Sequence, residues 1–321
     1  MHVSFLDASK AFDRVDHDTL FRILKGRNVP NNVLKVLEFL YCNQKCQVSW
    51  DGVLSKEFCS TRGVKQGGVL SPHFFNVYMD ELSDRLKSIR TGCVVDGKVI
   101  NHLIYADDIV LFSPTANGLQ QLLDTCNSFA EEFKLSFNPI KSVCMILNQN
   151  KSLDCIPVPT FLLQGKALAI VEEIKYLGSI ISCNLIDDSD IADRIRWIYS
   201  TANILSRKFS LCNTVVKQKL FKTYFNQVYG ICLWAQCSAK SLQRIKVAYN
   251  DAYRIIFNVK RGESVSNHMV SNRILTFQEM RRISVYRALQ RFAGSTNCIL
   301  AYCSQKNYAK VLKSILYLVD R

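Results

Sequence analysis

Two adjacent carboxylates, Asp107 and Asp108, interrupt the otherwise apolar and strand-forming run 103–112. A buried charge without a partner is strongly destabilising, so such a pair is expected at a turn or beside cations. If the run folds back as a hairpin with the pair at its tip, both carboxylates can reach one solvent-facing site. A polar turn without any chemistry is an equally good interpretation of this segment alone.

A third acid makes chemistry the better interpretation. Asp7 closes the short apolar stretch 3–6, which is expected to be a strand. A sheet that sets the hairpin tip beside the end of this strand brings three acids together, and they cannot all stay ionised without a cation. Oxygen ligands favour Mg²⁺ or Mn²⁺. Two such ions about 3.5–4 Å apart support nucleotidyl transfer; a metal-dependent nuclease would also use clustered acids.

The apolar spacing predicts the elements that position these acids. Asp51-Gly52 is a strong turn signal and predicts a hairpin formed by 44–50 and 53–58. Short strands separated by prolines and glycine are expected over 136–182. Helices are expected over 18–27, 31–42, from Pro72 onward, and 117–134.

The chain changes character near residue 185, where we expect a domain boundary. Residues 1–185 predict an α+β domain with helices on a mostly antiparallel sheet, and 186–321 predict a basic, almost entirely helical region. Residues 1–189 have a formal charge of −2, whereas 190–321 have +16. A basic half beside a neutral half indicates a nucleic-acid surface or a well-solvated helical face.

Composition excludes several classes of protein. Of 321 residues, 48% are hydrophobic and 21% charged, which is typical of a well-cored globular chain rather than a disordered one. No apolar run is long enough to cross a bilayer and no signal peptide is evident. The thirteen scattered cysteines do not form zinc-ligand spacings and are expected to be buried thiols of an intracellular protein, in the nucleus or the cytoplasm.

Five ordered segments resemble the motifs of reverse transcriptases from non-LTR (LINE-type) retrotransposons. Tyr105-Ala-Asp107-Asp108 is similar to the Tyr-x-Asp-Asp box of that family. The other four segments are similar to motifs A, B, D and E and cover residues 5–13, 63–78, 135–142 and 175–178. The resemblance implies a polymerase palm followed by a helical thumb, and RNA-directed DNA polymerase activity.

The resemblance also implies roles at the matching positions. Asp7, Asp107 and Asp108 would bind two Mg²⁺ or Mn²⁺ ions, with the Ala8 carbonyl as a further ligand. Phe12 would be the steric gate that favours deoxynucleotides, although its position alone also fits a core residue. Lys141 would protonate the leaving pyrophosphate, although a lone lysine near a turn is usually solvated.

The remaining implied roles concern the nucleic acid. Gln66, Gly67 and Gly68 would lie under the nascent base pair, and Tyr176, Leu177 and Gly178 would form part of the primer grip. The partners would be an RNA template, a DNA primer and dNTPs. No family motif fixes the phosphate contacts of the thumb. Charge and helical pattern alone make the following basic residues candidates for them: Arg194, Arg196, Arg207, Lys208, Lys217, Lys219 and Lys222.

The family places a fingers region ahead of motif A, and here only six residues precede Asp7. We therefore expect an N-terminally truncated polymerase whose isolated chain extends primers little or not at all. The alternative is a catalytically inactive remnant that keeps the palm fold and binds nucleic acid. The sequence does not indicate an oligomeric state.

Overall fold

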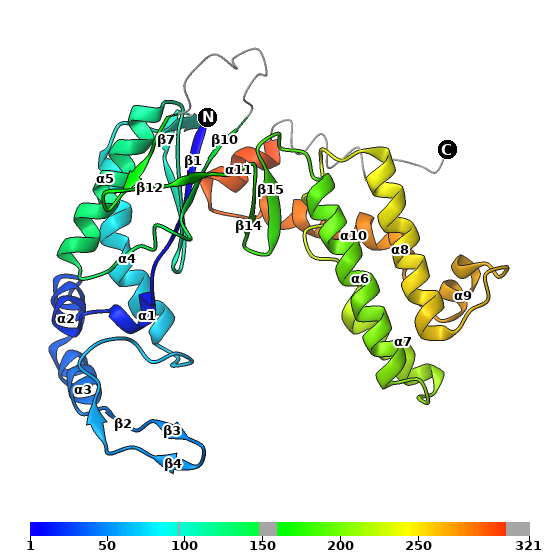
Figure 1. The fold of residues 1–321 in the computed structure, drawn as a ribbon, viewed down its shortest axis with the longest axis horizontal. Helices are drawn as coiled ribbons and strands as arrows, with labels where there is room; N and C mark the ends of the chain where they lie inside the picture. Colours follow the sequence, from blue (N-terminus) through cyan, green and yellow to red (C-terminus); the bar gives the residue numbers. More distant parts are fainter. Residues whose placement is uncertain (96, 148–158, 306–321) are drawn as a thin grey trace. The chain divides into compact units, whose positions relative to one another are not determined.

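The computed structural model describes residues 1–95, 97–147 and 159–305. The chain forms two compact units, Met1–Val171 and Glu172–Arg321. The first unit holds one main sheet with helices packed against it. The second unit has a short hairpin followed by helices. The α+β class expected from the sequence is confirmed (Figure 1).

A five-stranded sheet forms the centre of the first unit, in the order β13-β10-β1-β9-β8. Its pairs are antiparallel except for β10 with β13. The strand β1 lies in the middle, which suits its run of four consecutive buried residues. The strands span β1 His2–Asp7, β8 His102–Tyr105, β9 Asp108–Ser113, β10 Val143–Ile146 and β13 Ala169–Ile170.

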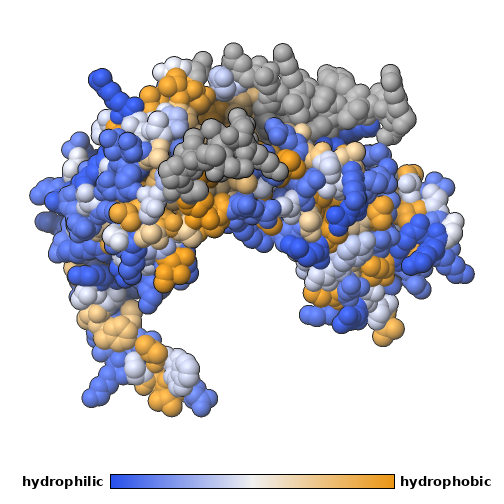
Figure 2. Space-filling view, turned by 45° about the horizontal axis from the view of Figure 1, so that its top comes forward, coloured by the Kyte–Doolittle hydropathy of each residue, from blue (hydrophilic) through white to orange (hydrophobic). Residues whose placement is uncertain are grey.

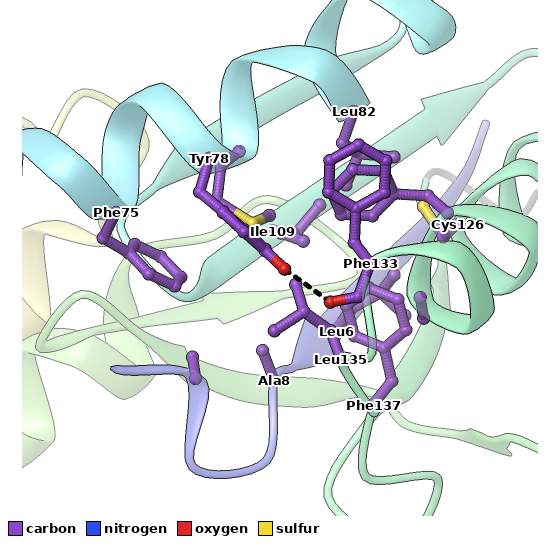
Figure 3. Close-up of a cluster of buried hydrophobic side chains, with 14 of the residues drawn as sticks. Leu6, Ala8, Phe75, Tyr78, Leu82, Ile109, Cys126, Phe133, Leu135 and Phe137 are labelled. Atoms are coloured by element: carbon purple, nitrogen blue, oxygen red, sulfur yellow. Dashed lines mark hydrogen bonds between the residues drawn. The ribbon is translucent and has the colours of Figure 1, made fainter. Parts of the chain in front are cut away.

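Two long helices, α4 (Ser71–Ser88) and α5 (Ala116–Glu132), pack with the sheet residues Leu6 and Ile109 in one hydrophobic core. Figure 3 shows the Tyr78 hydroxyl within this core, where it donates a hydrogen bond of 2.6 Å to the Phe133 carbonyl. Burial raises the pKa of Tyr78 to about 12, so the phenol remains a donor at all ordinary pH values.

The Tyr78 hydroxyl also accepts the amide of Asp16, at 3.4 Å. Asp16 caps the following helix through a hydrogen bond from the Thr19 amide and pairs with Lys134 at 2.8 Å. One buried phenol therefore ties the segment after β1 to the end of α5, and so fixes where the residues after Asp7 lie.

The remaining elements of the first unit lie around this core. The hairpin β3–β4 projects from it, and Trp50 at its tip is 81% exposed. Figure 2 shows hydrophobic residues along this projecting arm, at the lower left of the view. The elements are α1 Ala11–Arg14, α2 His17–Gly26, α3 Asn31–Cys42, β2 Lys45–Cys46, β3 Ser49–Trp50, β4 Val53–Leu54, β5 Phe58–Cys59, β6 Cys93–Val95, β7 Lys98–Ile100, β11 Leu162–Leu163 and β12 Lys166–Ala167.

The second unit begins with the antiparallel hairpin β14–β15, and β15 packs against α6. Its largest core lies among α6, α7, α8 and the residues that follow them. The elements are β14 Glu173–Tyr176, β15 Ser179–Ser182, α6 Asp188–Lys208, α7 Thr214–Phe225, α8 Ala239–Phe257, α9 Val265–Ser271, α10 Phe277–Ala293 and α11 Cys298–Gln305.

Most elements expected from the sequence are present. The four predicted helices correspond to α2, α3, α4 and α5, and the predicted turn at Asp51-Gly52 joins β3 to β4, with both residues at positive φ. The compact units divide after Val171, earlier than the expected boundary near residue 185, because β14–β15 packs with α6. No helix in the described ranges combines the length and apolarity that a bilayer crossing requires.

The expectation for the cysteines is only partly confirmed. The described cysteines are free thiols, and Cys126 and Cys144 are buried. The expectation of burial is wrong for Cys42 and Cys59, which are exposed. Cys42 ends α3 and Cys59 ends β5, at the two places where the chain passes between the main core and the projecting arm.

Gly63 joins the loop ahead of α4 to the segment after β1. Its amide donates to the Val15 carbonyl at 2.8 Å, its φ is +91°, and an added Cβ would lie 2.9 Å from the Asp13 carbonyl oxygen. We expect Gly63→Ala to lower the free energy of unfolding by about 2 kcal/mol or more, measured by urea denaturation, because strain and a backbone clash add.

The matched control is Gly52→Ala. Gly52 has a φ of +78°, and an added Cβ meets nothing within 4 Å. This variant should show only the cost of the left-handed backbone, about 1–2 kcal/mol. Equal losses in the two variants would contradict the close approach at Gly63.

Candidate active site

The strands β1 and β9 place two acids side by side. Asp7, at the end of β1, is the direct antiparallel partner of Asp108, at the start of β9. Directly opposed residues of an antiparallel pair project from the same face of the sheet, with Cβ atoms about 4.5–5.5 Å apart. Two residues a hundred positions apart in the chain therefore present their carboxylates next to each other.

Asp107 lies in the turn of the β8–β9 hairpin. Tyr105 pairs with Asp108, which leaves a two-residue turn of Ala106 and Asp107, with Ala106 at a φ of 53°. Asp107 is exposed, whereas Asp108 and Asp7 are half-buried. The predicted hairpin with the acidic pair at its tip is confirmed, and it brings all three acids to one edge of the sheet.

The electrostatics of Asp108 agree with this placement. Burial raises the pKa of the Asp108 carboxyl above its usual range, and the negative charges of Asp107 and Asp7 raise this pKa further. Each charge acts on Asp108 because it lies nearby, so the three carboxylates form one electrostatic group. A cation placed among them would relieve the repulsion.

A short loop holds the fourth charged group of the site. The Lys141 ammonium nitrogen lies 4.0 Å from an Asp7 carboxylate oxygen, and both side chains are solvent-accessible. The Asn138 side chain accepts the amides of Ile140 and Lys141. The Ser142 hydroxyl accepts the Asp7 amide at 3.1 Å. The sequence did not indicate that Asn138 and Ser142 hold this loop through their side chains. The turn signal Asn138-Pro139 is the feature that could have pointed to them.

The backbone of Ala8, the residue after Asp7, is held in place by its neighbours. Ala8 forms an isolated antiparallel bridge with Phe137. The hydrogen bonds of this bridge come from its neighbours: the Asn138 amide donates to the Asp7 carbonyl, and the Ser9 amide donates to the Ser136 carbonyl. The bridge thus fixes the backbone at Ala8 without using the Ala8 carbonyl.

Phe12 lies on α1 and stacks on a buried ring. Its ring centroid is 4.6 Å from that of Phe75, with 18° between the ring planes. The Phe12 carbonyl accepts the Val64 amide at 2.8 Å, which docks the loop ahead of α4 onto α1. Phe12 is half-buried, while Phe75 is fully buried. One face of the Phe12 ring therefore packs against Phe75 of α4.

Gln66, Gly67 and Gly68 form a turn in this same loop. Gln66 and Gly67 are exposed, and Gly67 has a φ of +80°. An added Cβ at Gly68 would lie 2.7 Å from the Ser71 hydroxyl, which itself donates to the Lys65 carbonyl. The backbone of the turn is accordingly open on one side and tightly packed where it enters α4.

The acids supply the right donor chemistry for a hard divalent cation, because every donor is an oxygen. Within the described residues, however, no three acid, histidine or cysteine side chains already converge on one point suited to a metal ion. Metal binding would therefore require the carboxylates of Asp7, Asp107 and Asp108 to draw closer together. The backbone positions of the three acids suit a metal site, but their side chains do not already surround one point.

The second unit contains the other predicted contacts. Leu177 and Gly178 form the turn between β14 and β15, at φ values of 44° and 82°, and Tyr176 ends β14. Among the predicted phosphate contacts, Arg194 is mostly buried, with 12% of its side chain exposed, and it donates to the Gly178 carbonyl. The exposed members of that set are Arg196, Arg207, Lys208, Lys219 and Lys222, and Lys217 is half-buried.

The family model described as reverse transcriptase (RNA-dependent DNA polymerase) matches residues 1–181, more than half of the chain. The chain belongs to the reverse transcriptase family. Relatives whose names describe an RNA-directed DNA polymerase come from non-LTR retrotransposons, as the five motifs indicated. Enzymes of this family use divalent metal ions and bind nucleic acid.

Two relatives from Drosophila melanogaster show the extent of the likeness. A Pol polyprotein of a type-2 retrotransposable element is 33% identical over 55% of this chain and 17% of its own length. The RNA-directed DNA polymerase of the mobile element jockey is 28% identical over 93% of this chain and 34% of its own length. This reverse transcriptase chain thus spans about a sixth to a third of these relatives.

Among solved structures, a telomerase from Candida tropicalis, in complex with a fragment of telomeric RNA, is similar to 99% of this chain. The identity is 13%, the TM-score is 0.47, and 49% of the telomerase chain is covered.

Proposed function

We propose that this chain is the palm and thumb portion of an RNA-directed DNA polymerase of a non-LTR retrotransposon. The observation that carries the proposal is the in-register pair Asp7 and Asp108, with Asp107 at the adjoining turn. Membership of the reverse transcriptase family supports the reaction class, and the charge coupling at Asp108 supports a cation site. Residues 1–185 would act as the palm, and 186–321 as the thumb and C-terminal region.

Each residue of the site has a proposed task. Asp7, Asp107 and Asp108, with the Ala8 carbonyl, would hold two Mg²⁺ or Mn²⁺ ions. When bound, such ions lower the pKa of a 3′-hydroxyl and stabilise charge on the transferring phosphoryl group. Lys141, next to Asp7, would donate a proton to the leaving pyrophosphate.

The substrate contacts follow from the neighbouring elements. Phe12 would close the sugar side of a dNTP pocket. The open turn at Gln66, Gly67 and Gly68 would lie against the nascent base pair, where small residues allow close approach. The hairpin tip Tyr176, Leu177 and Gly178 would support the end of a DNA primer paired with an RNA template. A nuclease would also use the acids, but it leaves Phe12 and this open turn without a task.

Metal uptake tests the acid site directly. In a Mn²⁺ titration of the whole chain followed by electron paramagnetic resonance of free Mn²⁺, we expect saturable binding that Asp7→Asn weakens by about tenfold or more. Asp13→Asn, a change of an exposed acid on the neighbouring α1, should bind Mn²⁺ normally. Identical binding by the two variants would contradict the site, and a nucleic-acid-binding remnant without metal would then be the better function.

Salt dependence tests the thumb assignment. The exposed cations of α6 and α7 should contact phosphates, so binding of an RNA–DNA duplex should weaken with ionic strength. We expect Arg207→Gln to reduce the log–log salt slope by roughly 0.7–0.9, the contribution of one neutralised phosphate. Arg27→Gln, in the first unit and paired with Asp80, is the control and should leave the slope unchanged. A salt-insensitive affinity would reject the charged thumb.

A further inference from the structure

The turn between β14 and β15 is held by side chains of the helical part of the second unit. The Tyr229 hydroxyl donates to the Leu177 carbonyl at 2.7 Å. The Arg194 guanidinium donates to the Gly178 carbonyl. Both carbonyls of this two-residue turn are thus bound from outside the hairpin. Such a turn would otherwise satisfy these carbonyls with water.

Asp190, near the start of α6, connects the hairpin to the rest of the unit. It is only 4% exposed. One carboxylate oxygen accepts the Ile180 amide at 2.9 Å, and the other accepts the Trp234 indole N–H at 2.8 Å. The Arg194 guanidinium lies 3.8 Å away. A buried carboxylate is stable only when it is paired and hydrogen-bonded in this way.

The Ile180 amide shows that this contact is specific. In the register of the hairpin, Ile180 pairs with Lys175 and the closing pair is Tyr176 with Ser179. Hydrogen-bonded and non-hydrogen-bonded pairs alternate along an antiparallel ladder, so the Ile180 amide points away from β14. Asp190 therefore takes an edge amide of β15 that the hairpin itself cannot use.

The segment after α7 completes the contact. The Arg194 guanidinium lies over the Tyr229 ring, 5.2 Å from its centroid. Gly230 follows at a φ of +81°, and an added Cβ would lie 3.3 Å from both an Asp190 carboxylate oxygen and the Ser179 hydroxyl. Glycine at this position lets the chain pass close to the carboxylate and presents Tyr229 to the turn.

We propose that Asp190, Arg194 and Tyr229 are positioning residues for the primer-grip turn, so that Leu177 and Gly178 move as one body with α6. The positioning role rests on the proposed polymerase function, whereas the physical clamp does not. Each contact fixes a backbone atom of the hairpin: two turn carbonyls and the Ile180 amide. The side chains themselves need not touch substrate. Their expected effect is on how tightly a primer end is held, and not on the chemical step.

Tyr229→Phe is the mildest test, because it removes one hydroxyl and keeps the ring beneath Arg194. Tyr199→Phe is the matched control, because the Tyr199 hydroxyl donates to Asp251 on α8 and does not contact the hairpin. In the whole chain we expect Tyr229→Phe to speed amide hydrogen exchange at 177–180 roughly 3- to 10-fold, the value of one hydrogen bond. Tyr199→Phe should leave exchange there unchanged.

A second variant and a second readout separate this clamp from the polymerase assignment. Arg194→Gln should weaken binding of an RNA–DNA primer–template by roughly 3- to 10-fold in fluorescence anisotropy, and Arg194→Lys should restore part of it. Where extension is measured, KM for primer should rise with kcat little changed. Unchanged hairpin exchange in both Tyr229→Phe and Arg194→Gln overturns the clamp, even if Mn²⁺ binds. Faster exchange with unchanged duplex affinity overturns the positioning role.

Discussion

Asp107→Asn is expected to abolish primer extension while leaving the fold intact. The substitution keeps the size and turn preference of the side chain but removes a charged metal ligand at the hairpin tip. Loss of one preorganised charge contact commonly costs about 10²–10³ in rate, and a shared metal ligand should cost about 10³ or more. The measurement is single-nucleotide primer extension by a polypeptide that contains this chain and is active in the assay.

The same variant should be slightly more stable than the unaltered chain when metal is absent. The folded-state pKa of Asp108 is raised, first by burial and then by the charges of Asp107 and Asp7. Ionisation of Asp108 therefore costs stability. This cost is absent below the ordinary Asp pKa of about 3.9 and grows as the pH rises through the raised folded-state pKa. Removing the exposed charge of Asp107 should recover a few tenths of a kcal/mol up to about 1 kcal/mol at pH 7.

Two measurements on Asp107→Asn distinguish a lost ligand from a damaged fold. Urea denaturation in EDTA at pH 7 should show equal or higher stability, and the gain should vanish as the pH falls through the acidic range. Added Mn²⁺ should stabilise the unaltered chain more than the variant, since binding to the folded state adds free energy. Marked destabilisation of the metal-free variant would count against clustered acids, and full activity would reject the metal-ligand role.

The sequence was most informative where a local rule was broken. A pair of acids in an apolar run requires a turn, and that rule located the β8–β9 hairpin and its tip. Asp51-Gly52 was informative for a different reason: this dipeptide favours a turn in which both residues adopt positive φ, as they do here. The pairing of Asp7 with Asp108 depends on which strands lie together, and here the order of family motifs, not periodicity, was decisive.

Single polar residues in long-range contacts could not be predicted. Tyr78 is one apolar-face position of a helix in the sequence, yet its hydroxyl joins the Asp16 and Phe133 backbones. Asp190 reads as an ordinary acid in the first turn of a helix, yet it bonds Ile180 and Trp234. Arg194 was expected to contact phosphate because of its charge and its place in a helical pattern. Such partners are determined by tertiary packing, which no spacing rule encodes.

The geometry at Phe12 gives the gate assignment a physical basis. A steric gate must resist displacement when a ribose 2′-hydroxyl presses on it. Stacking on the fully buried Phe75, and attachment of the Phe12 backbone to Val64, leave the ring little freedom to withdraw toward α4. A 2′-hydroxyl would then have to overlap the ring or shift the sugar, and overpacking of this kind costs about 1–3 kcal/mol.

Phe12→Val should therefore relax sugar selection. We expect the ratio of ribonucleotide to deoxynucleotide incorporation to rise roughly 10- to 100-fold, the range that relief of such an overlap represents. Phe12→Tyr is the matched control, because it keeps a ring stacked on Phe75 and should keep the selection. The assay is competitive single-nucleotide extension by the same active polypeptide, with urea denaturation to check folding. Equal sugar preference in Phe12→Val and the unaltered protein would mean that the ring serves only to pack α1 against α4.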